Sequence, residues 1–144
     1  MREIDIRDLW FDFAAAFVQR KNASGWDALS VQEQEIAALW MLEADVYNGG
    51  FLQFFCNGGE EAYNYAVRAL QAIGAVHALD VVKSGYACIE HLSEDNRLTQ
   101  LWDIPTFLTE EETAILDKLD ARFWQDPDRI AELAYRYYVV GGIS

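Results

Sequence analysis

Cysteine, histidine and proline are scarce in this chain, whose 144 residues contain only two of each. The two cysteines, Cys56 and Cys88, are too few for the disulfide framework of a small secreted protein, so we expect free thiols. No apolar run approaches the roughly 20 residues of a membrane-spanning helix. Met1 to Asp5 show no basic region followed by an apolar one, so we see no secretory signal and expect a cytoplasmic protein.

Basic residues are also few, since 11 Lys and Arg stand against 24 Asp and Glu, for a formal net charge of -13. The phosphates of nucleic acids and of anionic membranes would be repelled, which argues against direct binding to either. A cationic protein partner is favoured, because long-range attraction would speed the encounter. The competing explanation for the acidity is solubility alone.

Helical periodicity, in contrast, runs along nearly the whole sequence. Apolar residues recur at helical spacing from Ile6 to Phe17, and capping boxes at 30–33 and 109–112 each predict the start of a helix. Gly74 is expected to end one helix and Gly141 another. Strand signals are poor, because no long alternation of apolar and polar residues occurs.

We therefore predict an all-α fold, a single domain over residues 1–144 that packs as a compact bundle of about six helices plus a short helix at 51–56. Asp126-Pro127 is typical of a helix start and predicts that the last helix begins there. Residues 93–108 are the least regular and are expected to form a loop with a short turn.

Two Asn-Gly-Gly triplets, at 48–50 and 57–59, flank an apolar segment that contains three phenylalanines. A phosphate-binding loop is a poor explanation, because the spacing differs from a P-loop and no Lys or Arg lies between Lys21 and Arg68. A structural joint fits better: Asn48-Gly49 would adopt left-handed conformations and end a helix, and the Phe rings would be buried. The amide of Gln53, within the apolar run, would then pair with a free backbone group at one of the helix ends.

The run from residue 43 to 57 resembles the defining motif of a bacterial family typified by an acidic DNA-mimic protein. The matching residues are Glu43, Asn48, Gly49, Gly50, Phe51, Gln53 and Asn57. Cys56 stands where the family usually has Tyr or Phe. Residues 66–75 and the segment that begins with 119–123 also look like parts of this family, so the resemblance covers roughly residues 30–140.

The resemblance implies an all-α fold, a homodimer and an activity that does not involve catalysis. Members of this kind present carboxylates where DNA would present phosphates, and so block a DNA-binding protein such as a helix-turn-helix repressor. Most members have no established function, and the motif is interpreted as structural. The distribution of charge must therefore decide whether this chain mimics DNA.

A DNA mimic needs an extended array of carboxylates, since duplex DNA carries one charge per about 1.7 Å of its axis. Asp5, Asp8 and Asp12 would lie along one face of a helix. Glu110, Glu111, Glu112, Asp117 and Asp120 form a second cluster. Acidic residues at a helix start are also explained by the helix dipole, but this does not account for Asp117 and Asp120.

Enzymatic chemistry has little support in the sequence. Cys88 and His91 are spaced to share a helix face beside Glu90, yet they supply half of a zinc site at most. The same two residues would need a third group to act as a thiol nucleophile. No metal and no cofactor is expected.

The first hypothesis is a non-enzymatic, acidic binding protein that occupies the basic surface of a DNA-binding protein, such as a transcription regulator, through the two acidic clusters. An immunity-type or accessory protein that caps a basic toxin or nuclease shares the same acidity and stays open as the alternative. A metal or thiol enzyme at Cys88 and His91 is the third hypothesis.

Overall fold

The computed structural model describes residues 5–141 and is helical almost throughout, which confirms the all-α prediction. Residues 1–4, on which part of the cytoplasmic expectation depends, lie outside the described residues. None of the helices in 5–141 is long and apolar enough to cross a membrane.

Helix α1 (Ile6–Ser24) crosses one end of the molecule and is followed by the short 3-10 helix η1 (Trp26–Ala28). Helix α2 (Val31–Ile73) starts at the predicted capping box, where Ser30 Oγ accepts from Glu33 N at 3.2 Å and Glu33 Oε1 accepts from Ser30 N at 2.9 Å. It ends at Gly74, which takes the left-handed conformation that the sequence predicted for a stop.

α2 is three helical segments rather than one rod, because the backbone leaves helical geometry at Gly49, Gly50 and Gly59. The two glycine triplets therefore break the chain as predicted. The residues with positive φ are Gly50 at 79° and Gly59 at 63°, however, and not Asn48 or Gly49. The second glycine of each region supplies the turn, because a residue without Cβ reaches positive φ without strain.

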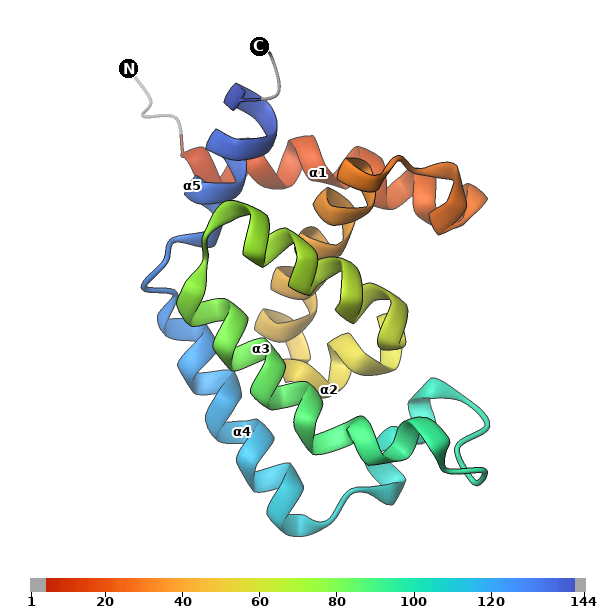
Figure 1. Ribbon diagram of the computed structural model, residues 1–144. Helices are drawn as coiled ribbons and strands as arrows, with labels where there is room; N and C mark the ends of the chain where they lie inside the picture. The colour runs from red at the N-terminus through yellow and green to blue at the C-terminus, as the bar shows by residue number, and fades with distance from the viewer. Residues whose placement is uncertain (1–4, 142–144) are drawn as a thin grey trace.

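Helix α3 (Val76–Ile89) and helix α4 (Glu110–Gln125) lie side by side and antiparallel (Figure 1). Between them the chain forms two 3-10 helices, η2 (Glu90–Glu94) and η3 (Leu101–Phe107). The prediction of a loop with a short turn at 93–108 was therefore wrong for η3. The sequence hides η3 because a short 3-10 segment has no 3.6-residue apolar period.

The last helix, α5 (Ile130–Ala134), starts later than predicted and continues into a π-helical turn, η4 (Tyr135–Val140). Asp126 does cap it, since its Oδ1 accepts from Ile130 N at 3.0 Å. Asp126 and Arg129 both have positive φ, at 45° and 57°, so residues 126–129 form a turn and the start of α5 moves to Ile130.

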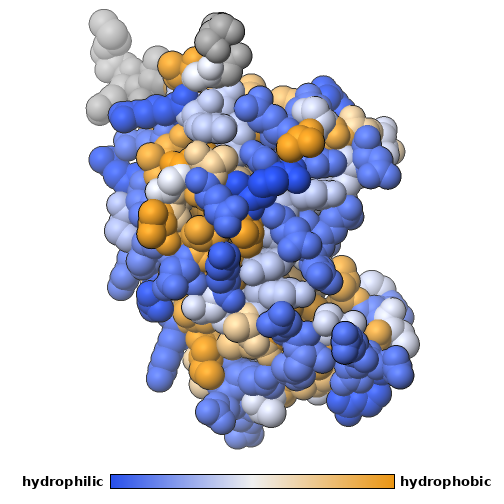
Figure 2. Space-filling view, viewed as in Figure 1, coloured by the Kyte–Doolittle hydropathy of each residue, from blue (hydrophilic) through white to orange (hydrophobic). Residues whose placement is uncertain are grey.

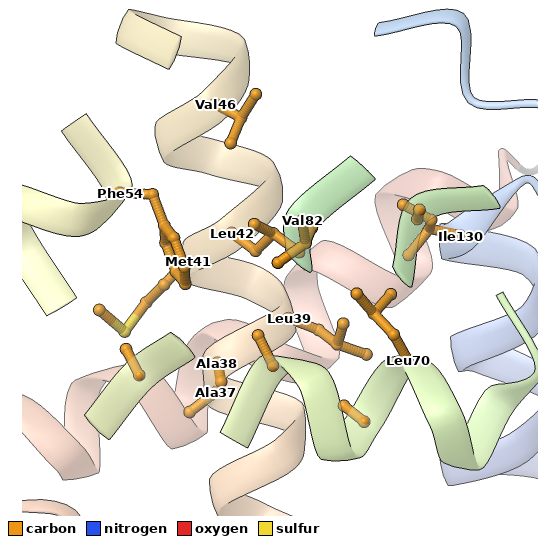
Figure 3. Close-up of a cluster of buried hydrophobic side chains, with 14 of the residues drawn as sticks. Ala37, Ala38, Leu39, Met41, Leu42, Val46, Phe54, Leu70, Val82 and Ile130 are labelled. Carbon is orange, nitrogen blue, oxygen red and sulfur yellow. The ribbon is translucent and has the colours of Figure 1, made fainter. Parts of the chain in front are cut away.

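The core lies where the first segment of α2 meets α3 and α5 (Figure 3). Leu39, Leu42 and Val46 of α2 are fully buried near Val82 and Ile130. The three phenylalanines of the glycine-flanked segment are also fully buried, as predicted. Each such ring contributes roughly 1.5–3 kcal/mol of hydrophobic stabilisation.

A buried polar cluster ties the C-terminal turn to both ends of α2. Tyr138 donates to Glu35 Oε1 at 2.8 Å, and Arg68 Nε donates to Glu35 Oε2 at 2.7 Å. Burial and the neighbouring Glu35 carboxylate raise the pKa of Tyr138, which therefore stays a hydroxyl donor.

Candidate partner-binding surface

The Asn-Gly-Gly motif is a joint held by side chains, not a ligand loop. Gln53 Nε2 donates to Asp45 Oδ1 at 3.1 Å, and Asn48 Nδ2 donates to Gln53 Oε1 at 2.9 Å. Asn57 Nδ2 reaches the same oxygen of Asp45 at 3.3 Å. The Gln53 amide thus pairs with side chains, so the expected pairing with a backbone group at a helix end was wrong.

Asp45, one helical turn before the break, is the acceptor that gathers this network. Burial raises the pKa of its carboxyl group, while the amides of Gln53 and Asn57 lower it. Sequence reasoning missed Asp45. The signal that could have found it is its place in the motif, three residues before Asn48.

Glu43 is the motif residue with the least solvent exposure, at 1%. Its Oε1 and the nearby Trp10 Nε1 are both buried without a hydrogen bond of good geometry to any group in residues 5–141. Burial raises the pKa of Glu43 to about 8, and the charge of Asp126 adds to the rise. The carboxyl group is consequently largely protonated at neutral pH and adds little to the acidic surface.

On α1, the three predicted acids are exposed and lie on the side opposite the buried Trp10 and Ala14. Asp5 also caps the helix, because its Oδ1 accepts from Arg7 N at 2.9 Å. No Lys, Arg or His within residues 5–141 forms an ion pair with Asp5, Asp8 or Asp12. We call these three residues the α1 acidic stripe.

On α4, Glu110, Glu111 and Asp117 are exposed, and none of them is paired with a cation of the described residues. Glu110 and Asp117 are seven residues apart and lie on one line of the helix with Trp124, whose side chain is 50% exposed. We call Glu110 and Asp117 the α4 acidic stripe.

The other two predicted acids of α4 have internal partners. Glu112 accepts from Thr109 N at 2.8 Å in the capping box, and its other oxygen lies 2.7 Å from His91 Nε2. Asp120 is partly buried, and its Oδ1 accepts from Phe51 N at 2.9 Å. This hydrogen bond holds α4 against the motif joint. The approach is so close that a Cβ on Gly50 would collide with the same carboxylate.

A cavity of about 390 Å³ lies between Trp124, near the end of α4, and Asp5, the first residue of the α1 acidic stripe. Trp124 and Asp126 line it from the α4 side, and Asp5 lines it from α1. Arg7 and Arg129 line it too, so this junction carries both signs of charge. Both non-glycine residues with positive φ in the described chain, Asp126 and Arg129, belong to this wall.

The thiol and metal hypothesis gains nothing from the geometry. Burial and the Glu112 charge raise the pKa of Cys88, which makes its thiol a weaker nucleophile. His91 faces Glu112, and Cys88 Sγ contacts Ser84 O at 3.7 Å. No three His, Cys, Asp or Glu side chains of the part that the structure describes converge as metal ligands do.

The fold and the site together define an acidic, all-α protein that carries one stripe of exposed carboxylates on α1 and another on α4, with a glycine-broken central helix. The chain belongs to the DMP19-like protein family, whose model matches residues 27–140. The match covers most of the chain and includes the motif, α4 and the C-terminal helix, in agreement with the region predicted from the sequence. Comparison with curated proteins and with solved structures found no match.

Proposed function

We propose that this protein is a non-enzymatic DNA mimic that occupies the DNA-binding surface of a basic protein, such as a transcription regulator. The DMP19-like family is typified by a DNA mimic, and the net charge of -13 gives this member the required sign. The observation that carries the proposal is the row of exposed, unpaired carboxylates on α4 and α1.

The spacing of the α4 acidic stripe supports this role. Glu110 and Asp117 are seven positions apart on the helix, which corresponds to a rise of about 10.5 Å. Each strand of duplex DNA carries one phosphate per about 3.4 Å of the helix axis, so the rise between these two carboxylates corresponds to about three base-pair steps along that axis. Trp124 lies on the same side of α4 and lines the cavity of about 390 Å³, and Asp5, the first residue of the α1 acidic stripe, lines the same cavity.

The proposed contact set is Asp5, Asp8, Asp12, Glu110, Glu111 and Asp117. We leave out Glu112 and Asp120, because both are only partly exposed and hold internal contacts. Asp5 stays in the set because it is exposed, although one of its oxygens caps α1. A second copy in a homodimer, which the family resemblance implies, would double this surface.

The first test is capture of partners from a lysate of the source cell at low salt, followed by elution with rising salt. We expect one basic DNA-binding protein that duplex DNA displaces, since affinity between exposed charges falls steeply with ionic strength. Recovery of a toxin or nuclease that the protein caps would instead support the immunity-type alternative.

The surface itself is tested with the double variant E110K/D117K and the matched control D27K/E61K. Each pair reverses two acids and changes the net charge from -13 to -9, but Asp27 and Glu61 lie near Tyr65 and outside both stripes. We expect E110K/D117K to abolish binding of the captured regulator and the control to retain it. Equal loss in both variants would show that total charge, and not this surface, governs binding.

A further inference from the structure

An apolar slot of about 190 Å³ opens between the kinked part of α2 and the end of α3. Its walls come from three separate stretches of chain. The lining residues are Gly59, Glu60, Tyr86, Ile89, Leu92, Ser93, Leu98, Leu101 and Ile104. Most of them are apolar, so the slot is an apolar recess and not a polar groove.

The second glycine break and η3 build this slot together. Gly59 turns the chain with φ 63°, and a Cβ at this position would lie only 3.1 Å from Leu101 Cδ1. The absence of that Cβ lets Leu101 approach the backbone and form one wall. Ile104 is buried beneath and fixes η3 in place.

The size of the slot selects its occupant. Ligand pockets for small molecules usually enclose about 300–1,000 Å³, so this slot is too small for a typical one. It has room for a single large apolar side chain. Beside it, Trp102 is 69% exposed, which leaves apolar surface available to extend such a contact.

The rim of the slot is acidic. Glu60 lines it directly. Burial raises the pKa of the Tyr86 hydroxyl, and the nearby charges of Glu60 and Glu90 add to the rise. Glu94 follows Ser93 in η2 and is exposed. Arg97, the cation of this segment, is neutralised by Asp95 at 2.7 Å, and no Lys or Arg lines the slot.

The slot also adjoins the proposed DNA-mimic surface. The 2.7 Å contact between His91 and Glu112 holds η2 against the first turn of α4, where Glu110 and Glu111 are exposed. Figure 2 shows one face of the molecule, which is largely polar with apolar patches. An apolar recess among acids complements a segment that carries one apolar side chain between basic ones.

We propose that this slot is a docking site for a basic amphipathic segment of a protein partner, which inserts one large apolar side chain and pairs its Lys or Arg residues with the acidic rim. This inference rests on the proposed function, because the partner that supplies the segment is the basic DNA-binding protein proposed above. It adds an apolar anchor to a surface otherwise recognised by charge, and anchors in tight pockets carry much of the binding energy at interfaces.

The test uses synthetic helical peptides of about 16 residues, long enough to form a helix in water. The first contains Lys and Ala with one central Phe, the second replaces that Phe with Ala, and the third keeps Phe but replaces Lys with Glu. Fluorescence anisotropy with the full-length protein should show the Phe peptide binding about tenfold or more tightly than the Ala peptide, as burial of one ring predicts. The Glu peptide should not bind.

Two variants of the protein locate the contact. Ser93→Trp fills the slot from an exposed position and should make the Phe and Ala peptides bind alike. Glu60→Lys should weaken both Lys peptides and keep their ratio, while the matched reversal Asp27→Lys, at an exposed position outside both stripes and outside the slot lining, should have a much smaller effect. Circular dichroism of each variant shows whether the helical fold is retained.

Equal binding of the Phe and Ala peptides to the unmodified protein would overturn the proposal. So would an unchanged ratio in Ser93→Trp, or an equal effect of Asp27→Lys and Glu60→Lys. If sedimentation shows that Ser93→Trp converts a dimer into a monomer, the occupant is a second copy of this chain, and the assignment to a basic segment is wrong.

The outcome is separable from that of the proposed function. Loss of the slot contact would leave displacement of the regulator by DNA intact, because that displacement depends on α4 and α1. A failure of DNA mimicry would leave the peptide preference for Phe intact, because the peptides test the slot directly.

Discussion

Single residues in this protein show how burial decides what a carboxyl group does. Glu43, Asp120 and Glu110 have the same functional group, yet only Glu110 presents a free charge to solvent. Glu43 is enclosed and protonated near neutral pH, and Asp120 holds a backbone amide. A count of acids therefore overestimates the charge that a partner meets.

The raised pKa of Glu43 predicts a stability that depends on pH. The native state keeps the proton up to a pKa of about 8, whereas the unfolded chain loses it near the ordinary value of 4.5. The free energy of unfolding should therefore fall as pH rises between these values, by as much as about 1.4 kcal/mol per pH unit from this residue.

The variant Glu43→Gln isolates this contribution, because it keeps the shape of the protonated side chain and cannot ionise. Urea denaturation at pH 5, 6, 7 and 8 should show the variant gaining stability relative to the parent as pH rises. Parallel pH profiles for the two proteins would mean that Glu43 ionises normally in the folded state.

At the scale of elements, α4 and the motif joint are coupled by one hydrogen bond. Asp120→Ala should cost about 1–3 kcal/mol, because the Phe51 amide would be left without a partner in a partly buried place. Asp117→Ala, one turn away and exposed, is the matched control and should change stability by less than about 0.5 kcal/mol. If urea denaturation gives comparable losses of unfolding free energy for the two variants, this hydrogen bond does not couple α4 to the motif joint.

The first glycine break makes a related prediction. Gly50→Ala should destabilise the protein more than Gly74→Ala does, although both glycines have positive φ. A Cβ at Gly50 would collide with the Asp120 carboxylate, whereas nothing lies within 4 Å of a Cβ at Gly74. Thermal unfolding compares the two, and equal losses would show that backbone strain alone requires glycine at position 50.

At the scale of the whole molecule, self-repulsion among the acids opposes the compact state. We expect the melting temperature to rise between low salt and about 0.15 M NaCl, where the Debye length falls to about 8 Å. The rise should be smaller in E110K/D117K, whose net charge is -9 instead of -13. Circular dichroism measures the melting temperature at each salt concentration. A melting temperature that falls with added NaCl would show that attractive ion pairs dominate instead.

The fold was largely predictable because its signals are local. The capping boxes at Ser30 and Thr109, the stop at Gly74 and the apolar spacing of the helices each depend on residues within a few turns of one another. The start of α5 and the helix η3 were missed. Left-handed residues at Asp126 and Arg129 and a short 3-10 segment leave no periodic trace in the sequence.

The sequence by itself determined the class of the protein: an all-helical chain with a large negative charge and the motif of an acidic family. Only the tertiary structure decided which acids are available, because burial and hydrogen bonding depend on contacts between residues as far apart as Phe51 and Asp120. The apolar slot arises for the same reason, since Gly59, Ile89 and Leu101 meet only when the chain is folded.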